Sequence, residues 1–198
     1  MYISIDQSTS SSTVFLYNKN LKLLSKTSKK HKQIQKKFGY VEHDAEAIYK
    51  NILLLLKKLS KKIKFNKNLF LSITNQRETF VIFDTVSGKP LHNAIVWQCR
   101  RGQKVCDKIN KSSLHKKLIK EDTGLTLDTY FPAPKLVQLL ASNNKLKEKL
   151  KKGSALFGTI DTYLIYRLTK QKSYTTDTTN ASRTLFFNNK SLRWSKKL

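Results

Sequence analysis

Short apolar segments of strand-like composition alternate with longer amphipathic segments, and this alternation restricts the possible folds more than any other feature of the chain. Residues 2–5, 14–17 and 21–26 are rich in branched aliphatic and aromatic side chains, which is typical of β-strands. After Asp44, which is suited to an N-cap, apolar residues recur every three or four positions through 45–59, and this predicts an amphipathic helix. Strands grouped with helices in this order predict a mixed α/β domain.

The rest of the chain continues this pattern. Further strands are predicted at residues 69–73, 80–84 and 94–97. We also expect an exposed loop at 29–39, helices at 102–118, 135–141, 145–151 and 158–168, a strand with a turn at 174–188, and the start of a helix at 191–198. The longest apolar run, residues 52–56, is far shorter than the roughly 20 residues of a membrane-spanning helix, so no membrane span is expected.

The N-terminus and the cysteines indicate a protein of the cytoplasm. Residues 1–6 lack the basic start and the apolar stretch of a signal peptide. Cys99 and Cys106 do not form a C-x-x-C pair, so we expect two reduced thiols rather than a disulfide or a zinc site.

The chain is strongly basic, with 39 Lys and Arg against 13 Asp and Glu and a formal net charge of +26. Such a charge favours non-specific binding to polyanions, because neutralised phosphates release their counterions. Only six of the cations are arginines, however, and base-specific contacts favour the bidentate arginine side chain. We therefore expect no specific nucleic-acid partner, and polyanion binding stays as a competing hypothesis that rests on charge alone.

A polar run at residues 6–12 separates the first two predicted strands. Asp6 ends the first strand, and small hydroxyl residues follow it up to the second. Such a turn can aim backbone N–H groups and hydroxyls into one anion-binding concavity, and Asp6 is suited to hold Mg²⁺ through water. The alternative is an ordinary polar hairpin. The chain contains neither a G-x-x-x-x-G-K-[ST] loop nor a G-x-G-x-x-G motif.

Three further positions are candidates for binding a polyhydroxy ligand. Arg77 offers fixed donors and Glu78 offers acceptors in a polar run between two apolar strands, although a surface salt bridge would look the same. Trp97 ends a predicted strand and could pack on a polyol carbon chain, with a core tryptophan as the alternative. Tyr130 could supply a hydroxyl, or be a packed loop aromatic.

In their order and their amino-acid sequences, these segments resemble motifs of the FGGY carbohydrate kinases, and among them of the members that phosphorylate glycerol. The Asn-Gln-Arg-Glu-Thr segment at 75–79 and the Asn-Ala-Ser-Arg-Thr segment at 180–184 are the most specific. The resemblance covers nearly the whole chain, but only the N-terminal part of the family's two-lobed architecture. The other matching segments are residues 6–11, 39–44, 88–90, 93–98 and 157–162.

This resemblance implies the N-terminal lobe of an actin-like, ribonuclease H-like ATPase fold over residues 1–198, with a mixed sheet and flanking helices, and incomplete without later elements. It implies transfer of the γ-phosphoryl group of ATP to a terminal hydroxyl of glycerol, with Mg²⁺. The implied residues are Thr9, Ser10, Ser11 and Thr13 for the nucleotide, Asp6 near the metal, and Arg77, Glu78, Trp97 and Tyr130 for glycerol.

The chain departs from the family at three positions. Ser8 replaces a usual glycine, so the hairpin is expected to turn less freely. Thr13 stands where an arginine commonly contacts nucleotide phosphate, so we expect that contact to be lost. Thr129 replaces a common proline, which we expect to loosen the loop that holds Tyr130. These changes keep open a degenerate, non-catalytic remnant or polyol-binding module.

The family's catalytic aspartate is expected beyond Leu198, so the chain alone is expected to be inactive. Besides glycerol and ATP, the resemblance leaves two protein partners open: a second copy of the chain and a separately encoded C-terminal lobe.

Overall fold

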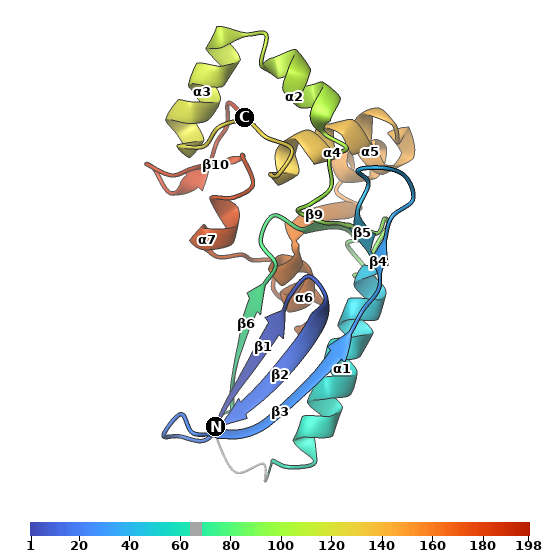
Figure 1. Ribbon diagram of the computed structural model, residues 1–198, viewed down its shortest axis with the longest axis vertical. Coiled ribbons are helices and arrows are strands. Elements are labelled where there is room, and N and C mark those ends of the chain that lie inside the picture. The colour runs from blue at the N-terminus through green and yellow to red at the C-terminus, as the bar shows by residue number, and fades with distance from the viewer. Residues whose placement is uncertain (64–68) are drawn as a thin grey trace.

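The computed structural model describes residues 1–63 and 69–198, which form two larger sheets that share a hydrophobic core with helices (Figure 1). The first sheet has the order β3-β2-β1-β6. Strand β1 runs antiparallel to β2 and parallel to β6, and β2 runs antiparallel to β3. Its strands are β1 (Tyr2–Gln7), β2 (Ser11–Tyr17), β3 (Leu23–Lys30) and β6 (Phe70–Asn75).

The second sheet has the order β4-β5-β8-β7-β9, and its neighbouring strands are antiparallel. A small third sheet pairs β10 with β11 near the end of the chain. The strands of these two sheets are β4 (Gln33–Ile34), β5 (Glu42–His43), β7 (Phe80–Asp84), β8 (Ala94–Ile95), β9 (Ala155–Thr159), β10 (Phe187–Asn188) and β11 (Arg193–Trp194).

Two helices join the larger sheets through one core. Helix α1 (Ala45–Ser60) buries its apolar stripe, including Ile48 and Ile52, against β2. Helix α6 (Ile160–Leu168) adds Tyr163, which is fully buried and packs edge-on against Phe83 of β7. Because burial of apolar surface is the main driving force for folding, this shared core fixes the two sheets relative to each other.

Of the remaining helices, α2 to α5 lie beyond the second sheet, with α2 and α3 at the top of Figure 1, and α7 lies at the left of the view. Helix α2 packs on α4, and α5 packs on both α4 and β9. Gly102 allows the close approach of α2 to α4, because a Cβ there would lie 2.8 Å from the carbonyl carbon of Pro134. These helices are α2 (Gln103–Ile109), α3 (Ser113–Thr123), α4 (Pro132–Ala141), α5 (Asn144–Lys151) and α7 (Thr178–Ala181).

The structure confirms several predicted elements. The strand at 80–84 has the predicted bounds, and the helix after Asp44 forms, with the Asp44 carboxylate accepting the Ala47 N–H at 3.0 Å. Among the described residues, no helix is both long and apolar enough to cross a membrane.

Three of the predicted helices are wrong in their extent, and one of them, predicted at 135–141, begins three residues earlier at Pro132. The single helix predicted at 102–118 is two helices, because Ser112 accepts the His115 N–H and so caps a second helix in a new direction. The helix predicted at 158–168 begins only at Ile160, since Gly158 is in β9 and pairs with Val81 of β7.

Three loop and end predictions are also wrong in part. Residues 29–39 are not all loop, because β3 continues to Lys30 beside β2 and β4 follows it. Residues 174–188 contain the short helix α7, which the Asp177 side chain caps. The helix predicted at 191–198 is absent, because Trp194 pairs with Phe187 in an antiparallel ladder.

Candidate active site

The hairpin between β1 and β2 and the turn after β6 lie at the same end of the first sheet. Strands β1 and β6 are parallel and in register through Gln7 and Asn75. The Gln76 N–H donates to the Gln7 carbonyl oxygen at 2.8 Å and extends that pairing by one residue. The predicted phosphate hairpin and the predicted polyol clamp therefore leave the sheet side by side.

The hairpin turn at residues 8–10 is closed by its own serines. The Ser8 N–H and the Ser8 hydroxyl donate to the Ser11 carbonyl oxygen at 2.9 and 3.0 Å. None of Ser8, Thr9 and Ser10 has a positive φ, so this turn does not require glycine. The expected restriction of the hairpin by Ser8 is therefore wrong for this backbone.

Trp97 and His31, which lie outside the hairpin, hold it in place through Thr9. The Trp97 indole N–H donates to the Thr9 hydroxyl at 3.0 Å, and a His31 ring nitrogen lies 2.9 Å from the Thr9 carbonyl oxygen. Because the Thr9 hydroxyl accepts from Trp97, its own proton is free to point at an added anion. Ser10 is exposed next to it.

Asp6 and Thr13 pair directly across the hairpin ladder, with Asp6 half-buried. The Thr13 hydroxyl donates to the Ser28 hydroxyl at 3.0 Å, so it is turned to β3 rather than joined to the serines of the turn. The described residues contain no cluster of three or more groups able to hold a metal ion. One carboxylate fits Mg²⁺, which keeps several waters and binds substrate phosphates.

In the predicted polyol clamp, Glu78 pairs with Arg183 and not with its neighbour Arg77. Glu78 is 2% exposed and has a φ of +62°, a left-handed conformation that is costly for a residue with a side chain. Its Oε1 accepts the Arg183 Nε–H at 2.5 Å. Arg77 is exposed and makes no hydrogen bond or ion pair with the described residues. The salt bridge between neighbours is therefore absent, and the Arg77 fork is free.

Trp97 and Tyr130 form an aromatic wall beside these groups. Their ring centroids lie 5.5 Å apart with the planes tilted by 57°. The backbone N–H of Trp97 donates to the hydroxyl of Thr79, the residue that follows Glu78, at 3.2 Å. Arg183 lies over the rings of Phe131 and Tyr130 as well as against Glu78, which connects the wall to the clamp. Sequence reasoning did not select Arg183 as a site residue, although it is part of the Asn-Ala-Ser-Arg-Thr segment.

Lys135 is a second residue that sequence reasoning missed. It is fully buried at the start of α4, and its ammonium donates to the carbonyl oxygens of Val96, Trp97 and Tyr130 at 3.2, 3.3 and 3.0 Å. Burial lowers the pKa of Lys135 to about 7, although nearby Glu78 acts in the opposite direction. The only sequence signal is a lysine that follows two prolines at the start of an apolar helix.

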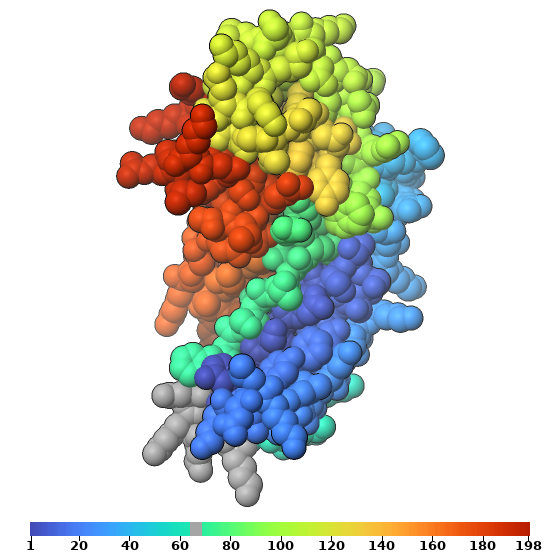
Figure 2. Space-filling view, turned by 60° about the vertical axis from the view of Figure 1, so that its left-hand side comes forward, coloured from blue at the N-terminus to red at the C-terminus, as the bar shows by residue number. Residues whose placement is uncertain are grey.

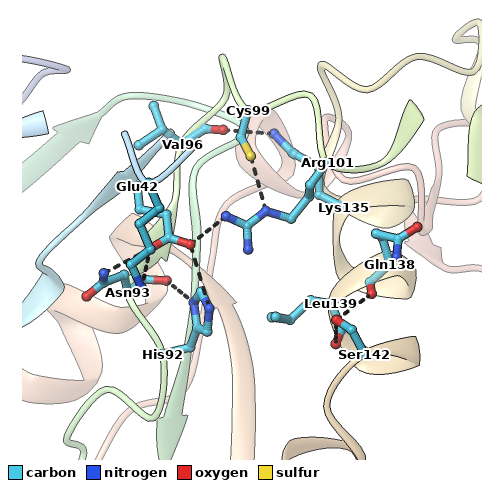
Figure 3. A network of polar contacts seen from close by, with 11 residues as sticks. Glu42, His92, Asn93, Val96, Cys99, Arg101, Lys135, Gln138, Leu139 and Ser142 are labelled. Carbon is cyan, nitrogen blue, oxygen red and sulfur yellow. Dashed lines mark hydrogen bonds and ion pairs between the residues drawn. The ribbon is translucent and has the colours of Figure 1, made fainter. Parts of the chain in front are cut away.

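A buried ion pair lies near the segment that follows β8 and carries Trp97 (Figure 3). Arg101 Nη2 donates to Glu42 Oε1 at 2.6 Å, and Arg101 Nε donates to the Cys99 sulfur at 3.1 Å. Burial raises the pKa of Glu42, but hydrogen bonds from Arg101 and Asn93 outweigh it, so the pKa lies below its usual value. The pair is thus a buried contact between β5 and the segment after β8.

A chain of contacts links the hairpin, the aromatic pair and Glu78. Figure 2 shows the green band of β6 between the blue N-terminal strands and the orange-red segment near the C-terminus, with yellow residues at its upper end. The residues that these contacts bring together are Thr9, Trp97, Tyr130, Arg183 and Glu78, while Ser10 and Arg77 are only their neighbours in sequence.

A family model for the N-terminal domain of the FGGY family of carbohydrate kinases matches residues 1–198. Glycerol kinase of Francisella philomiragia is 42% identical over 99% of this chain and 40% of its own length. Glycerol kinase 1 of Thermotoga maritima is 43% identical over 100% of this chain and 41% of its own length. The chain thus spans about two fifths of the length of these curated relatives.

Solved structures give the same relationship. The crystal structure of Plasmodium falciparum glycerol kinase with ADP superposes with a TM-score of 0.92 at 37% identity, covering 100% of this chain and 40% of that chain. Gluconate kinase from Lactobacillus acidophilus superposes with a TM-score of 0.86 at 25% identity, covering 99% of this chain and 38% of that chain. The expected actin-like α/β lobe is confirmed. The chain belongs to the FGGY family of carbohydrate kinases and corresponds to the N-terminal portion of its glycerol kinases.

Proposed function

We propose that residues 1–198 act as the N-terminal domain of a cytoplasmic enzyme that phosphorylates glycerol to sn-glycerol 3-phosphate with ATP. One observation carries this proposal: the parallel pairing of β1 with β6 sets the hydroxyl hairpin and the Arg77–Glu78 turn at one end of a sheet. Trp97 joins the two through its hydrogen bond to Thr9. A phosphoryl donor and an alcohol acceptor bound at these places would meet.

The polyol half of the site offers both kinds of hydrogen-bonding group. Arg77 supplies unpaired donors, and Glu78 keeps Oε2 as an acceptor while Oε1 is engaged by Arg183. Trp97 and Tyr130 supply an aromatic wall for the carbon chain, and the Tyr130 hydroxyl is a further polar group. A site of this kind discriminates against analogues that lack a hydroxyl, because its own groups would stay unpaired.

The nucleotide half is assigned to the hairpin. Thr9, Ser10 and Ser11 would donate to phosphate oxygens, and Asp6 would hold Mg²⁺ through water. Mg²⁺ when bound would neutralise charge on the transferred phosphoryl group. Thr13 is the weakest member of this set, because its hydroxyl proton is already used by Ser28. Positioning and charge neutralisation would carry catalysis, and the acceptor of the hydroxyl proton would come from polypeptide outside residues 1–198.

The engagement of Thr13 with Ser28 favours one second candidate, a polyol-binding module without kinase activity. Such a module would retain Arg77, Glu78 and the aromatic wall and would lack productive nucleotide contacts. Glycerol binding in calorimetry, without turnover of ATP by the completed enzyme, would identify it.

The experiment that tests the proposal completes the enzyme in trans. The chain is co-expressed with the part of the Thermotoga maritima relative that lies beyond the matched region, and glycerol 3-phosphate formed from ATP and glycerol is measured. We expect product from the pair and none from either part alone. An Arg77→Ala chain in the same pair serves as the matched control for the polyol site. A folded, associated pair that forms no product refutes the kinase assignment.

A further inference from the structure

Lys135 is hydrogen-bonded to the backbone of both residues of the aromatic wall. Its ammonium donates to Val96 and Trp97 in the segment after β8, and to Tyr130 in the loop before α4. All three acceptors are backbone carbonyls, so the contacts fix the course of the chain rather than single side-chain rotamers. Figure 3 shows Lys135 beside Val96 and Arg101.

The number of contacts matches the chemistry of the group. A lysine ammonium has three N–H donors and no acceptor, and here each donor has one carbonyl partner. A neutral amine has only two donors, so loss of the proton leaves one of the three carbonyls without its partner. A buried carbonyl that loses its partner favours rearrangement of the segment that carries it.

We propose that Lys135 is a positioning residue that sets the separation of Trp97 and Tyr130 and thereby the geometry of the proposed polyol site. The inference rests on the proposed function for the identity of the ligand. The positioning itself concerns only residues of this chain and can be measured without a ligand.

The charged surroundings make this position sensitive to pH. Burial is the largest influence on the Lys135 pKa and lowers it to about 7. Arg101 acts in the same direction, whereas Glu78, Asp128 and the Cys99 thiol favour the protonated form. Below this pKa all three carbonyls are paired. Above it the hydrogen bonds between the two segments weaken, and the loop of Tyr130 is free to move relative to Trp97.

The first test follows Trp97 by fluorescence in the full chain. The chain has two tryptophans, so Trp194→Phe leaves Trp97 as the only indole. We expect its emission to change with a midpoint near pH 7, and Lys135→Met to abolish this change. Lys147→Met, at an exposed lysine of α5, is the matched control and should leave the transition intact. A transition that persists unchanged in Lys135→Met overturns the proposal.

Two histidines near the hairpin need a separate control. His31 contacts Thr9, and its ring lies 4.7 Å from that of His43, so both could report on Trp97 through the hairpin. Burial lowers the pKa of both, that of His43 to about 4. His31→Asn should therefore keep the transition near neutral pH, and loss of the transition in this variant overturns its assignment to Lys135.

The second test measures glycerol binding by calorimetry at about pH 6 and about pH 9. We expect the affinity of the unsubstituted chain to fall about tenfold between them, and Lys135→Met to be weak at both. Equal affinities at both pH values overturn the proposal. If circular dichroism shows that Lys135→Met does not fold, the emission transition in the Trp194→Phe chain tests the proposal instead, and the absence of a transition near pH 7 overturns it. If no chain binds glycerol, the proposed function fails. The fluorescence experiment needs no ligand and still tests the positioning role of Lys135.

Discussion

Replacing Arg183 by glutamine tests how far the buried Glu78 carboxylate depends on one cation. Glu78 is 2% exposed, and its contact with Arg183 is its only side-chain hydrogen bond to the described residues. A hydrogen bond to a charged group contributes about 1.5–3 kcal/mol. Stacking of the guanidinium on Phe131 adds about 0.5–1 kcal/mol. Because 30% of the Arg183 side chain is exposed, water screens the pair, and we expect a loss of about 2–3 kcal/mol.

Urea unfolding followed by circular dichroism measures this loss. With a slope of about 1–3 kcal/mol per molar urea, the midpoint should fall by about 1 M or more. Arg100→Gln is the matched control, since Arg100 is exposed and its side chain makes no hydrogen bond with the described residues. Adding Glu78→Gln should make the double variant less destabilised than the sum of the single ones. A loss for Arg183→Gln no larger than that of the control refutes the reasoning.

Three other perturbations test separate parts of the site. Arg77→Ala should abolish glycerol binding and leave ATP affinity of the completed enzyme nearly intact, as calorimetry with each ligand would show. Trp97→Phe removes the indole donor to Thr9 and should lower the unfolding free energy by about 1 kcal/mol in urea, with Trp194→Phe as the exposed control. Burial, with the charge of His31 second, lowers the His43 pKa from 6.5 to about 4. The unfolded chain therefore binds the proton more tightly, and the unfolding free energy should fall as the pH drops from 6.5 to 4, less steeply in His43→Gln.

Local patterns predicted most of the elements that carry the site. The strand at 80–84 and the helix after Asp44 follow from apolar periodicity and a capping side chain, which are properties of neighbouring residues. The helix predicted at 102–118 was wrong because of a local cap at Ser112, but other wrong extents depend on distant partners. Gly158 is in a strand because Val81 pairs with it, and Trp194 is in a strand because Phe187 does. Such long-range pairing leaves no mark in a short window of sequence.

The site shows the same division. Its segments could be recognised from their order and their amino-acid sequences. The partner of Glu78 could not, because Arg183 lies 105 positions further along the chain. The neighbour Arg77 was the natural candidate, and the left-handed backbone at Glu78 turns the carboxylate into the interior instead. Lys135 resembles any surface lysine in the sequence. Only the fold brings three carbonyls from two segments to its ammonium.

The two halves of the site are also joined by a continuous hydrogen-bonded path. Gln76 Nε2 donates to the Gln7 side chain at 3.2 Å, and Gln76 Oε1 accepts from the Thr79 hydroxyl at 3.2 Å. The Thr79 hydroxyl in turn accepts the Trp97 N–H, and the Trp97 indole returns to Thr9 in the hairpin that Gln7 begins. This ring closes within one chain and needs no ligand. Because its members are already paired, the ring holds the hairpin and the Arg77–Glu78 turn at a fixed separation without a ligand, and the proposed phosphoryl transfer would require preorganisation of this kind.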